Sequence, residues 1–231
     1  MKSQKIATLL LASFSLFSHI HAENRIMDLG QIFHSYGSDK DVNGYTPIYH
    51  LLFDHLKEEP ITMLEIGIGT MIPHVPSSMV GYARAGYKPG GSLRAWRDYF
   101  VNGTIYGVDV QPDTQFSDEP RITTFLANST NSESVQELMH ELNDIQFDII
   151  LDDGSHIDRD QFKTLANFYP HLKEGGIYII EDIYPGSAVT TQPTVIAKLC
   201  NNDPFVYVGL KNNICVIYKK HLARPISNGN Y

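Results

Sequence analysis

Acidic side chains and a histidine follow two short apolar runs, at the point where each run ends. The sequence Asp-Asp-Gly-Ser-His at 152–156 comes directly after residues 147–151, and Glu-Asp at 181–182 comes directly after residues 176–180. Such runs are typical of buried strands in a parallel sheet. The carboxyl ends of neighbouring parallel strands meet at one crevice, where open α/β sheets bind ligands. We therefore expect these carboxylates and the imidazole to face one site.

Each of these residues also has a simpler interpretation when taken alone. Asp152 could cap the turn after its strand, with Asp153 and Gly154 forming an Asx turn. His156 could be a hydrogen-bonded structural residue. Three carboxylates held close together would repel one another, so the group as a whole favours a bound cation. Carboxylate oxygens suit Mg²⁺ or Mn²⁺, which would lower the pKa of a bound hydroxyl.

The elements that must position these residues alternate along the chain. Apolar spacing predicts helices at 25–36, 47–56, 92–100, 132–142, 161 to about 173 and 193–199, with Ser92 as an N-cap and Gly175 as a left-handed C-cap. It predicts strands at 62–67, 103–110, 122–126, 147–151, 176–180, 205–210 and 214–218. The alternation predicts a Rossmann-like, doubly wound α/β fold with a mostly parallel seven-stranded sheet and a C-terminal antiparallel hairpin.

A second group of candidate residues surrounds the end of the first strand. Residues 64–69 read Leu-Glu-Ile-Gly-Ile-Gly, in which Gly67 lets the backbone approach a ligand. Asp109 ends the next strand, where a carboxylate can accept both hydroxyls of a ribose. A dinucleotide site would need a glycine at Ile72 and has no use for Glu65. The pattern therefore favours S-adenosylmethionine over NAD.

Residues 37–182 resemble the macrocin and mycinamicin type of metal-dependent sugar O-methyltransferases, within the class I methyltransferases. The resemblance is carried by Gly-Ser-Asp-Lys at 37–40 with Tyr45 and Tyr49, by residues 64–67, 92–100 and 105–109, by Asp-Asp-Gly-Ser-His at 152–156, and by Ile-Ile-Glu-Asp-Ile at 179–183. It implies Mg²⁺ ligation by Asp153, Glu181 and Asp182, with His156 as the general base.

The resemblance also implies which residues contact the methyl donor. The cofactor residues expected here are Lys40, Tyr49, Glu65, Gly67, Asp109, Asn128, Ser129 and Asp152. For Lys40, a surface ion pair with Asp39 is the alternative. Asn128 and Ser129 stand where relatives tend to carry an acidic pair near the adenine, and both can still hydrogen-bond its edge.

The connection at 70–90 is long, aromatic and rich in glycine and proline. A connection of this length within a compact domain is usually a lid or a binding loop. Because it leaves the first strand at the catalytic edge, we expect His74, Tyr82 and Tyr87 within it to contribute to acceptor specificity.

The bulk composition limits the partners. A chain of 231 residues with 42% hydrophobic content forms one domain most simply, and its net charge of -8 argues against unaided binding to nucleic acid or an anionic membrane. A small-molecule or glycan acceptor fits better. The oligomeric state is not predicted.

The amino-terminal residues suggest export. Lys2 and Lys5 precede an apolar stretch at 6–17, which predicts a signal peptide at 1–22 and a methyltransferase domain at 23–231, with no stable membrane span after cleavage. Cleavage would place the protein in the periplasm or outside the cell, whereas an uncleaved leader would leave it cytoplasmic or membrane-associated. Cys200 and Cys215 could then form a disulfide, or remain buried thiols.

The leading hypothesis is a Mg²⁺-assisted O-methyltransferase that uses S-adenosylmethionine and acts on a hydroxyl of a sugar or glycosylated small molecule. An exported protein would not meet S-adenosylmethionine, which is made in the cytosol, so the alternative is an exported, non-catalytic ligand-binding protein with the same fold. Metal-assisted hydrolysis by the same carboxylates is a third possibility.

Overall fold

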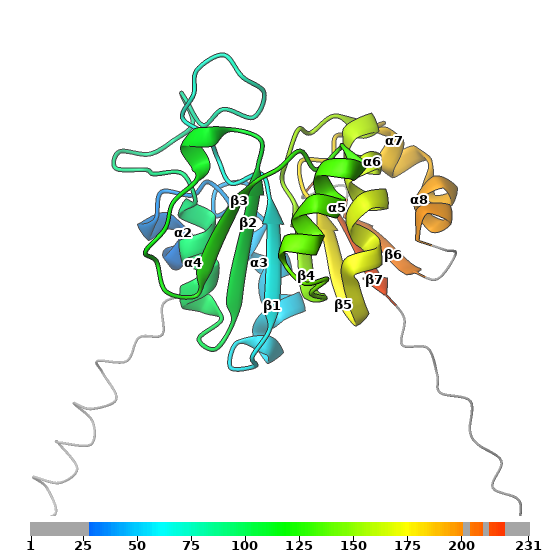
Figure 1. Ribbon diagram of the computed structural model, residues 1–231, viewed down its shortest axis with the longest axis horizontal. Coiled ribbons are helices and arrows are strands. Elements are labelled where there is room, and N and C mark those ends of the chain that lie inside the picture. Colours follow the sequence, from blue (N-terminus) through cyan, green and yellow to red (C-terminus); the bar gives the residue numbers. More distant parts are fainter. Residues whose placement is uncertain (1–27, 201–203, 210–212, 220–231) are drawn as a thin grey trace, which may run out of the picture.

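The computed structural model describes residues 28–200, 204–209 and 213–219 (Figure 1). Its helices are α2 (Leu29–Ser35), α3 (Thr46–Phe53), α4 (Gly91–Tyr99), α5 (Ser132–Glu141), α6 (Asp158–Phe168), α7 (Ala188–Thr191) and α8 (Pro193–Leu199). Its strands are β1 (Thr62–Ile66), β2 (Thr104–Asp109), β3 (Ile122–Leu126), β4 (Phe147–Asp152), β5 (Leu172–Ile180), β6 (Pro204–Gly209) and β7 (Ile214–Lys219). Short 3₁₀ helices span Asp54–Leu56, Pro112–Thr114 and Tyr169–His171.

The strands form one seven-stranded sheet in the order β3-β2-β1-β4-β5-β7-β6. The pairs among β1 to β5 are parallel, and β7 runs antiparallel to both β5 and β6. The predicted parallel sheet with its C-terminal antiparallel hairpin is therefore confirmed. The chain order reverses between β1 and β4, and such a switch point is where ligands bind at the carboxyl ends of the strands.

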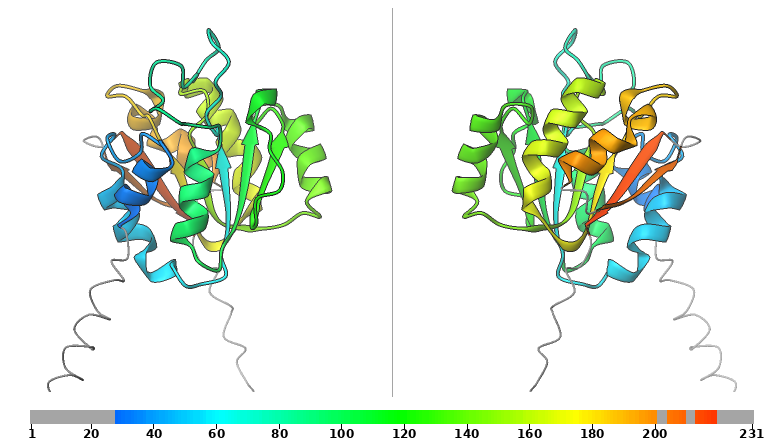
Figure 2. Two further views of the ribbon diagram at one scale, coloured as in Figure 1. Left: turned by 90° about the vertical axis from the view of Figure 1, so that its left-hand side faces the viewer. Right: turned by 90° about the vertical axis from the view of Figure 1, so that its right-hand side faces the viewer.

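Helices cover both faces of the sheet, as the two side views in Figure 2 show. Alternate side chains of each strand point to opposite faces, so Met63 and Leu64 belong to two different cores. The first core packs β1, β2, β4 and β5 against α2, α3 and α4, and Trp96 is fully buried within it. The second core packs the other face against α5, α6, α7 and α8.

Two local predictions are wrong, and one short helix was missed. Ser92 lies inside α4, whose N-cap is Gly90 with a φ of 80°, so the backbone rather than a serine hydroxyl starts that helix. Helix α6 ends at Phe168, and Gly175 lies within β5 with a φ of 78°. Helix α7 was not predicted, because its four residues are too few to show a period.

The two cysteines are free and buried. Burial raises the pKa of each thiol to about 12, so both are unreactive at neutral pH. The structure thus has the buried thiols and not the disulfide.

The predicted signal peptide at 1–22 lies outside the described residues. Within the described part of the chain, every helix is too short or too polar to cross a membrane.

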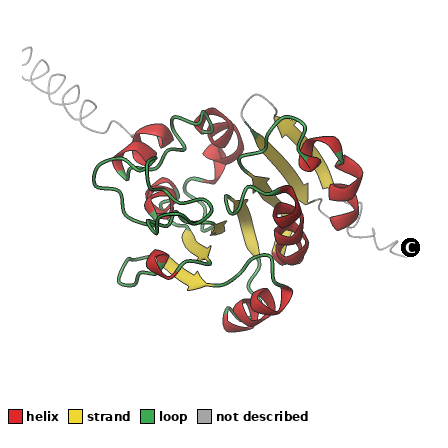
Figure 3. Ribbon diagram, turned by 90° about the horizontal axis from the view of Figure 1, so that it is seen from above, coloured by secondary structure: helices red, strands yellow, loops and turns green. Residues whose placement is uncertain are grey.

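The segment at 70–90 contains turns but no helix or strand, as expected. It rises above the carboxyl edge of the sheet in Figure 1, and Figure 3 shows the molecule from above, with loops in front of the strand ends. Two hydrogen bonds tie its base to the connection after β2: Asp113 accepts from the Thr70 hydroxyl at 2.5 Å and from the Met71 N–H at 2.7 Å. The loop is therefore anchored where it leaves β1.

Candidate active site

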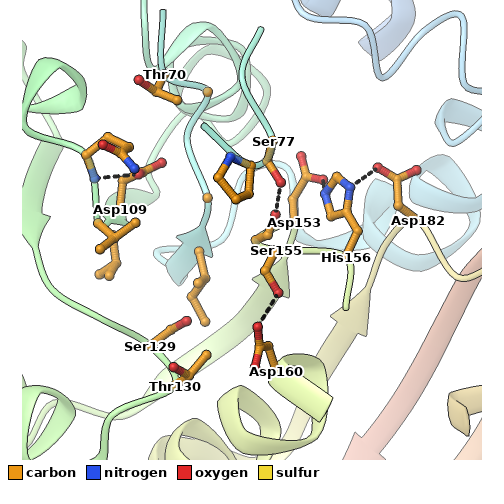
Figure 4. Close-up of a pocket in the computed structure, with 18 of the residues that line it drawn as sticks. Thr70, Ser77, Asp109, Ser129, Thr130, Asp153, Ser155, His156, Asp160 and Asp182 are labelled. Carbon is orange, nitrogen blue, oxygen red and sulfur yellow. Dashed lines mark hydrogen bonds and ion pairs between the residues drawn. The ribbon is translucent and has the colours of Figure 1, made fainter. Parts of the chain in front are cut away.

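A cavity of about 310 Å³ lies at the carboxyl ends of β1, β2 and β4, at the switch point of the sheet (Figure 4). Its lining includes Gly67, Thr70, Ser77, Met79, Asp109, Gln111, Asn128, Ser129, Thr130, Asp153, Ser155, His156 and Asp182. This volume is within the range of small-molecule sites. The cavity has two chemically different ends, because amides and hydroxyls follow β2 and β3, whereas carboxylates and an imidazole follow β4 and β5.

Gly67 allows the ends of β1 and β4 to meet. Its φ is 82°, and a Cβ at this position would lie 2.1 Å from the carbonyl oxygen of Asp153. The Asp153 N–H in turn donates to the Ile66 carbonyl at 2.8 Å. The glycine is thus needed for close approach of two backbone segments, and not only for approach to a ligand as the sequence suggested.

Asp109 dominates the first end of the cavity. Its two oxygens accept hydrogen bonds from the backbone N–H groups of Ile68 and Gln111, each at 2.9 Å. Burial raises the pKa of this carboxyl above its usual value. The two oxygens of a carboxylate offer about four lone-pair positions, so these bonds leave capacity for a ligand. Asn128 and Ser129 line the same end, and with Gly67 and Asp109 they are the predicted cofactor residues that reach the cavity.

Asp153, His156 and Asp182 come together at the second end. His156 Nε2 lies 3.3 Å from Asp153 Oδ1, and His156 Nδ1 lies 3.4 Å from Asp182 Oδ2. Figure 4 shows the imidazole between the two carboxylates. Both His156 and Asp182 have a positive φ, of 57° and 52°, a conformation that costs energy outside glycine and is frequent at functional sites.

The two carboxylates hold a proton on the imidazole. Burial acts to lower the pKa of His156, but the carboxylates of Asp153 and Asp182 beside it outweigh that effect and raise the pKa to about 9. Burial acts to raise the pKa of Asp153, but Lys40 and His156 outweigh it and lower that pKa. At neutral pH the cluster therefore contains an imidazolium and at least one ionised carboxylate.

The segment between α2 and α3 adds groups that sequence reasoning missed. The Tyr45 hydroxyl donates a short hydrogen bond to Asp182 Oδ1. Asp39 and Asn43 line the cavity beside it. Tyr45 is among the residues that carry the family resemblance, and this is the signal that could have identified it as a site residue. Its hydrogen-bond partner is 137 positions away in the chain, so the contact itself could not be predicted from the sequence.

The loop at 70–90 also contributes to the wall. Thr70, Ser77 and Met79 line the cavity, and the Ser77 hydroxyl donates to the Gly154 carbonyl at 2.6 Å. His74, Tyr82 and Tyr87, which the sequence singled out, are absent from the lining of this cavity. Tyr87 instead donates to the Gly69 carbonyl at 3.0 Å and packs the loop onto the turn after β1.

Four residues predicted to contact the cofactor do not line this cavity. Tyr49 is fully buried between Phe53 and Trp96. Asp152 is 2% exposed and accepts the Gly154 N–H at 3.2 Å, which is the capping interpretation of this residue. Lys40 and Glu65 are buried together behind the turn after β1. A surface ion pair of Lys40 with Asp39 is wrong, because Lys40 is 2% exposed.

The predicted metal ligands are divided between the cavity and the interior. The cluster whose potential ligand atoms lie within 4.8 Å of one another is Asp153, His156 and Asp182. Glu181 is 1% exposed, and its Oε2 accepts from Lys40 at 2.5 Å. Its Oε1 is buried with no hydrogen-bond partner among the described residues. The concentration of carboxylates and this unpartnered oxygen fit a divalent cation beside Asp153 and Asp182.

Known proteins with similar sequences are sugar O-methyltransferases. The chain is 36% identical over 151 residues to the 8-demethyl-8-alpha-L-rhamnosyl tetracenomycin-C 2'-O-methyltransferase of Streptomyces olivaceus, covering 64% of this chain and 35% of that protein. It is 34% identical over 159 residues to the demethylmacrocin O-methyltransferase of Streptomyces fradiae, covering 68% of this chain and 36% of that protein. No family model matches the chain. The resemblance predicted from the sequence is thus confirmed.

The fold has a similar counterpart among solved structures. The MycE methyltransferase of the mycinamycin biosynthetic pathway, solved with Mg, SAH and mycinamycin VI, matches with a TM-score of 0.68 at 25% identity, covering 94% of this chain and 60% of that chain. The architecture is therefore the Rossmann-like methyltransferase fold. This chain spans little more than a third of the length of the two sequence relatives described above.

Proposed function

We propose that this chain is an S-adenosylmethionine-dependent, Mg²⁺- or Mn²⁺-assisted O-methyltransferase that acts on a hydroxyl of a sugar or glycosylated small molecule. The main support is one continuous cavity, which joins the Asp109 end to the carboxylate and imidazole cluster. The similar proteins support the same reaction class, since they are named O-methyltransferases and the matching solved structure contains Mg and SAH.

The first end of the cavity would bind the methyl donor. Asp109 would accept hydrogen bonds from the ribose hydroxyls through its remaining lone pairs, and Asn128 or Ser129 would bond the adenine edge. When bound, the donor supplies an electrophilic methyl group, and a divalent cation supplies charge that lowers the pKa of an acceptor hydroxyl. The cation would be held by Asp153 and Asp182, with Glu181 Oε1 as the buried third oxygen.

His156 would accept the proton of the acceptor hydroxyl as the hydroxyl oxygen bonds to the methyl carbon and the bond between that carbon and the sulfur of the donor breaks, which leaves S-adenosylhomocysteine. A general base must be unprotonated, whereas Asp153 and Asp182 hold the pKa of His156 at about 9. Compensation of those two negative charges would release the imidazole for this role. In this arrangement, the ability of His156 to act as a base therefore depends on the bound cation.

Two measurements test this proposal. Calorimetry with S-adenosylhomocysteine, in EDTA and in Mg²⁺, tests donor binding, and transfer of a labelled methyl group to a panel of O-glycosides tests the reaction. We expect donor binding in both conditions, and Mg²⁺-dependent transfer that His156→Ala reduces roughly 10²- to 10⁴-fold. The absence of donor binding in both conditions would exclude the proposal. If methyl transfer is unchanged in EDTA, the metal part of the proposal is wrong.

A further inference from the structure

Lys40 lies behind the site rather than in it, although it comes from the segment before α3. Its ammonium group is 2% exposed and lies 2.7 Å from Asp153 Oδ2, 2.5 Å from Glu181 Oε2 and 3.3 Å from Glu65 Oε1. Lysine is almost never buried to this extent unless it is paired. One fixed cation therefore contacts a carboxylate from each of three adjacent strand ends.

The register of the sheet explains why these three carboxylates meet. Glu65 is paired with Leu151, and Leu151 is paired with Ile179. Asp153 and Glu181 each follow these partners by two positions, and residues two apart share one face of a strand. That face is covered by α2, α3 and α4, so the segment between α2 and α3 lies directly over it. The backbone geometry thus directs three acids toward Lys40.

One lysine lies among three acidic side chains at this point. The ammonium group of Lys40 is within 3.3 Å of the carboxyl groups of Asp153, Glu181 and Glu65. The imidazole of His156 is a second basic group, beside Asp153. Glu181 Oε1 remains without a hydrogen-bond partner in the described part of the chain. Asp153 and Asp182 lie at the open side of the cluster, where they line the cavity.

We propose that Lys40 is a built-in counter-cation of the metal site, a positioning residue that holds the strand-end carboxylates together when no divalent cation is bound. This inference rests on the metal part of the proposed function. With Lys40 present, the fold does not depend on the metal, and the positive charge behind the carboxylates limits the affinity of the site for a second cation. A lysine that served only to pack the core would have neither effect.

The test compares Lys40→Met with the wild type in thermal unfolding and Mn²⁺ titration, both at mildly alkaline pH so that carboxylates are ionised. In EDTA, loss of the buried pair is expected to lower the Tm of Lys40→Met by roughly 10 °C. Mn²⁺ should restore most of that loss, and should shift the Tm of the wild type much less. The Kd for Mn²⁺ should fall on the order of tenfold in the variant, because the repulsion by the ammonium is gone.

Lys173→Met is the matched control. Lys173 forms a 2.7 Å ion pair with Asp148 near the amino end of β4, at the opposite edge of the sheet, and its side chain is 40% exposed. Its removal deletes the same charge and an ion pair of the same length as the one between Lys40 and Asp153, but at a partly exposed position. It should leave the Kd for Mn²⁺ unchanged and lower the Tm equally with and without the cation.

The double variant Lys40→Met with Glu181→Gln covers the case in which Lys40→Met does not fold at any Mn²⁺ concentration. Recovery of much of the wild-type Tm in EDTA would support the counter-cation role, and no recovery would overturn it. Equal Mn²⁺ shifts in the wild type and Lys40→Met would overturn the inference and leave the proposed function intact. If no divalent cation shifts any of these proteins, both the inference and the metal part of the proposed function fail.

Discussion

Glu181 and Asp182 are adjacent in the chain, yet their carboxylates point to different parts of the site. Glu181 is buried and accepts a hydrogen bond from Lys40, whereas Asp182 reaches the cavity and faces His156. The positive φ of Asp182 turns its side chain out of the alternation of β5. The Glu181 carboxylate thus contacts the buried Lys40, whereas the neighbouring Asp182 carboxylate faces the cavity.

In EDTA, His156→Gln is expected to flatten the pH dependence of stability between pH 6.5 and about 9. In the folded protein the pKa of His156 is raised from 6.5 to about 9 by Asp153 and Asp182, against the opposing effect of burial. A raised pKa means that the folded state binds the proton more tightly, so the contribution is complete below pH 6.5 and is lost as the pH rises to about 9. Thermal unfolding over this range measures it. If the stability of the wild type and of His156→Gln changed with pH in parallel, the raised pKa could not be assigned to His156.

Asp109→Asn should weaken the binding of S-adenosylhomocysteine by roughly tenfold to a hundredfold, because a hydrogen bond to a charged acceptor is worth about 1.5–3 kcal/mol. The two backbone N–H groups that donate to Asp109 fix the orientation of the carboxylate in the wild type. Calorimetry gives the Kd directly. Glu174→Gln makes the same change of net charge at an exposed position and serves as the control. Equal affinities of the two variants would exclude Asp109 as a donor contact.

Gly67→Ala should destabilise the fold by at least about 2 kcal/mol, because the new methyl group adds a clash to an unfavourable φ. The Cβ would lie 2.1 Å from the Asp153 carbonyl oxygen. Gly186 has a similar φ of 86°, but a Cβ there would meet nothing within 4 Å, so Gly186→Ala isolates the cost of φ alone, about 1 kcal/mol. Chemical denaturation of both variants gives the difference. Equal losses of stability in Gly67→Ala and Gly186→Ala would mean that β1 and β4 can move apart around the new methyl group at no cost in free energy.

Asp113→Asn should loosen the loop at 70–90. The two hydrogen bonds from Thr70 and Met71 end on this one carboxylate, and an amide can accept only through its single oxygen. We expect faster hydrogen exchange within the loop and a KM for the acceptor raised several-fold, with donor affinity nearly unchanged. Asp118→Asn, exposed in the same β2–β3 connection, is the control. If hydrogen exchange in the loop is the same in Asp113→Asn and in Asp118→Asn, contacts other than those of Asp113 hold the start of the loop in place.

The secondary structure could be predicted from the sequence wherever an element coincides with a run of apolar residues. The limits of β3 and α8 match their predicted ranges, because short apolar runs between turn residues determine them. The electrostatic contacts were not predictable in the same way. Lys40 meets Asp153 and Glu181 across 113 and 141 positions, and only the sheet register brings these groups together. For the same reason, adjacency in the sequence did not show that Glu181 and Asp182 point apart.

The last prediction separates two tyrosines that stand one helical turn apart. The Tyr45 hydroxyl donates to Asp182, whereas the Tyr49 hydroxyl is buried with no hydrogen-bond partner among the described residues. Tyr45→Phe should weaken Mn²⁺ binding on the order of tenfold, because hydrogen-bonded partners orient metal ligands. Tyr49→Phe removes the same atom from the same aromatic cluster and should leave the Kd unchanged. Mn²⁺ titration of the two variants compares them directly. Equal weakening would show that packing, and not the bond to Asp182, governs the metal site.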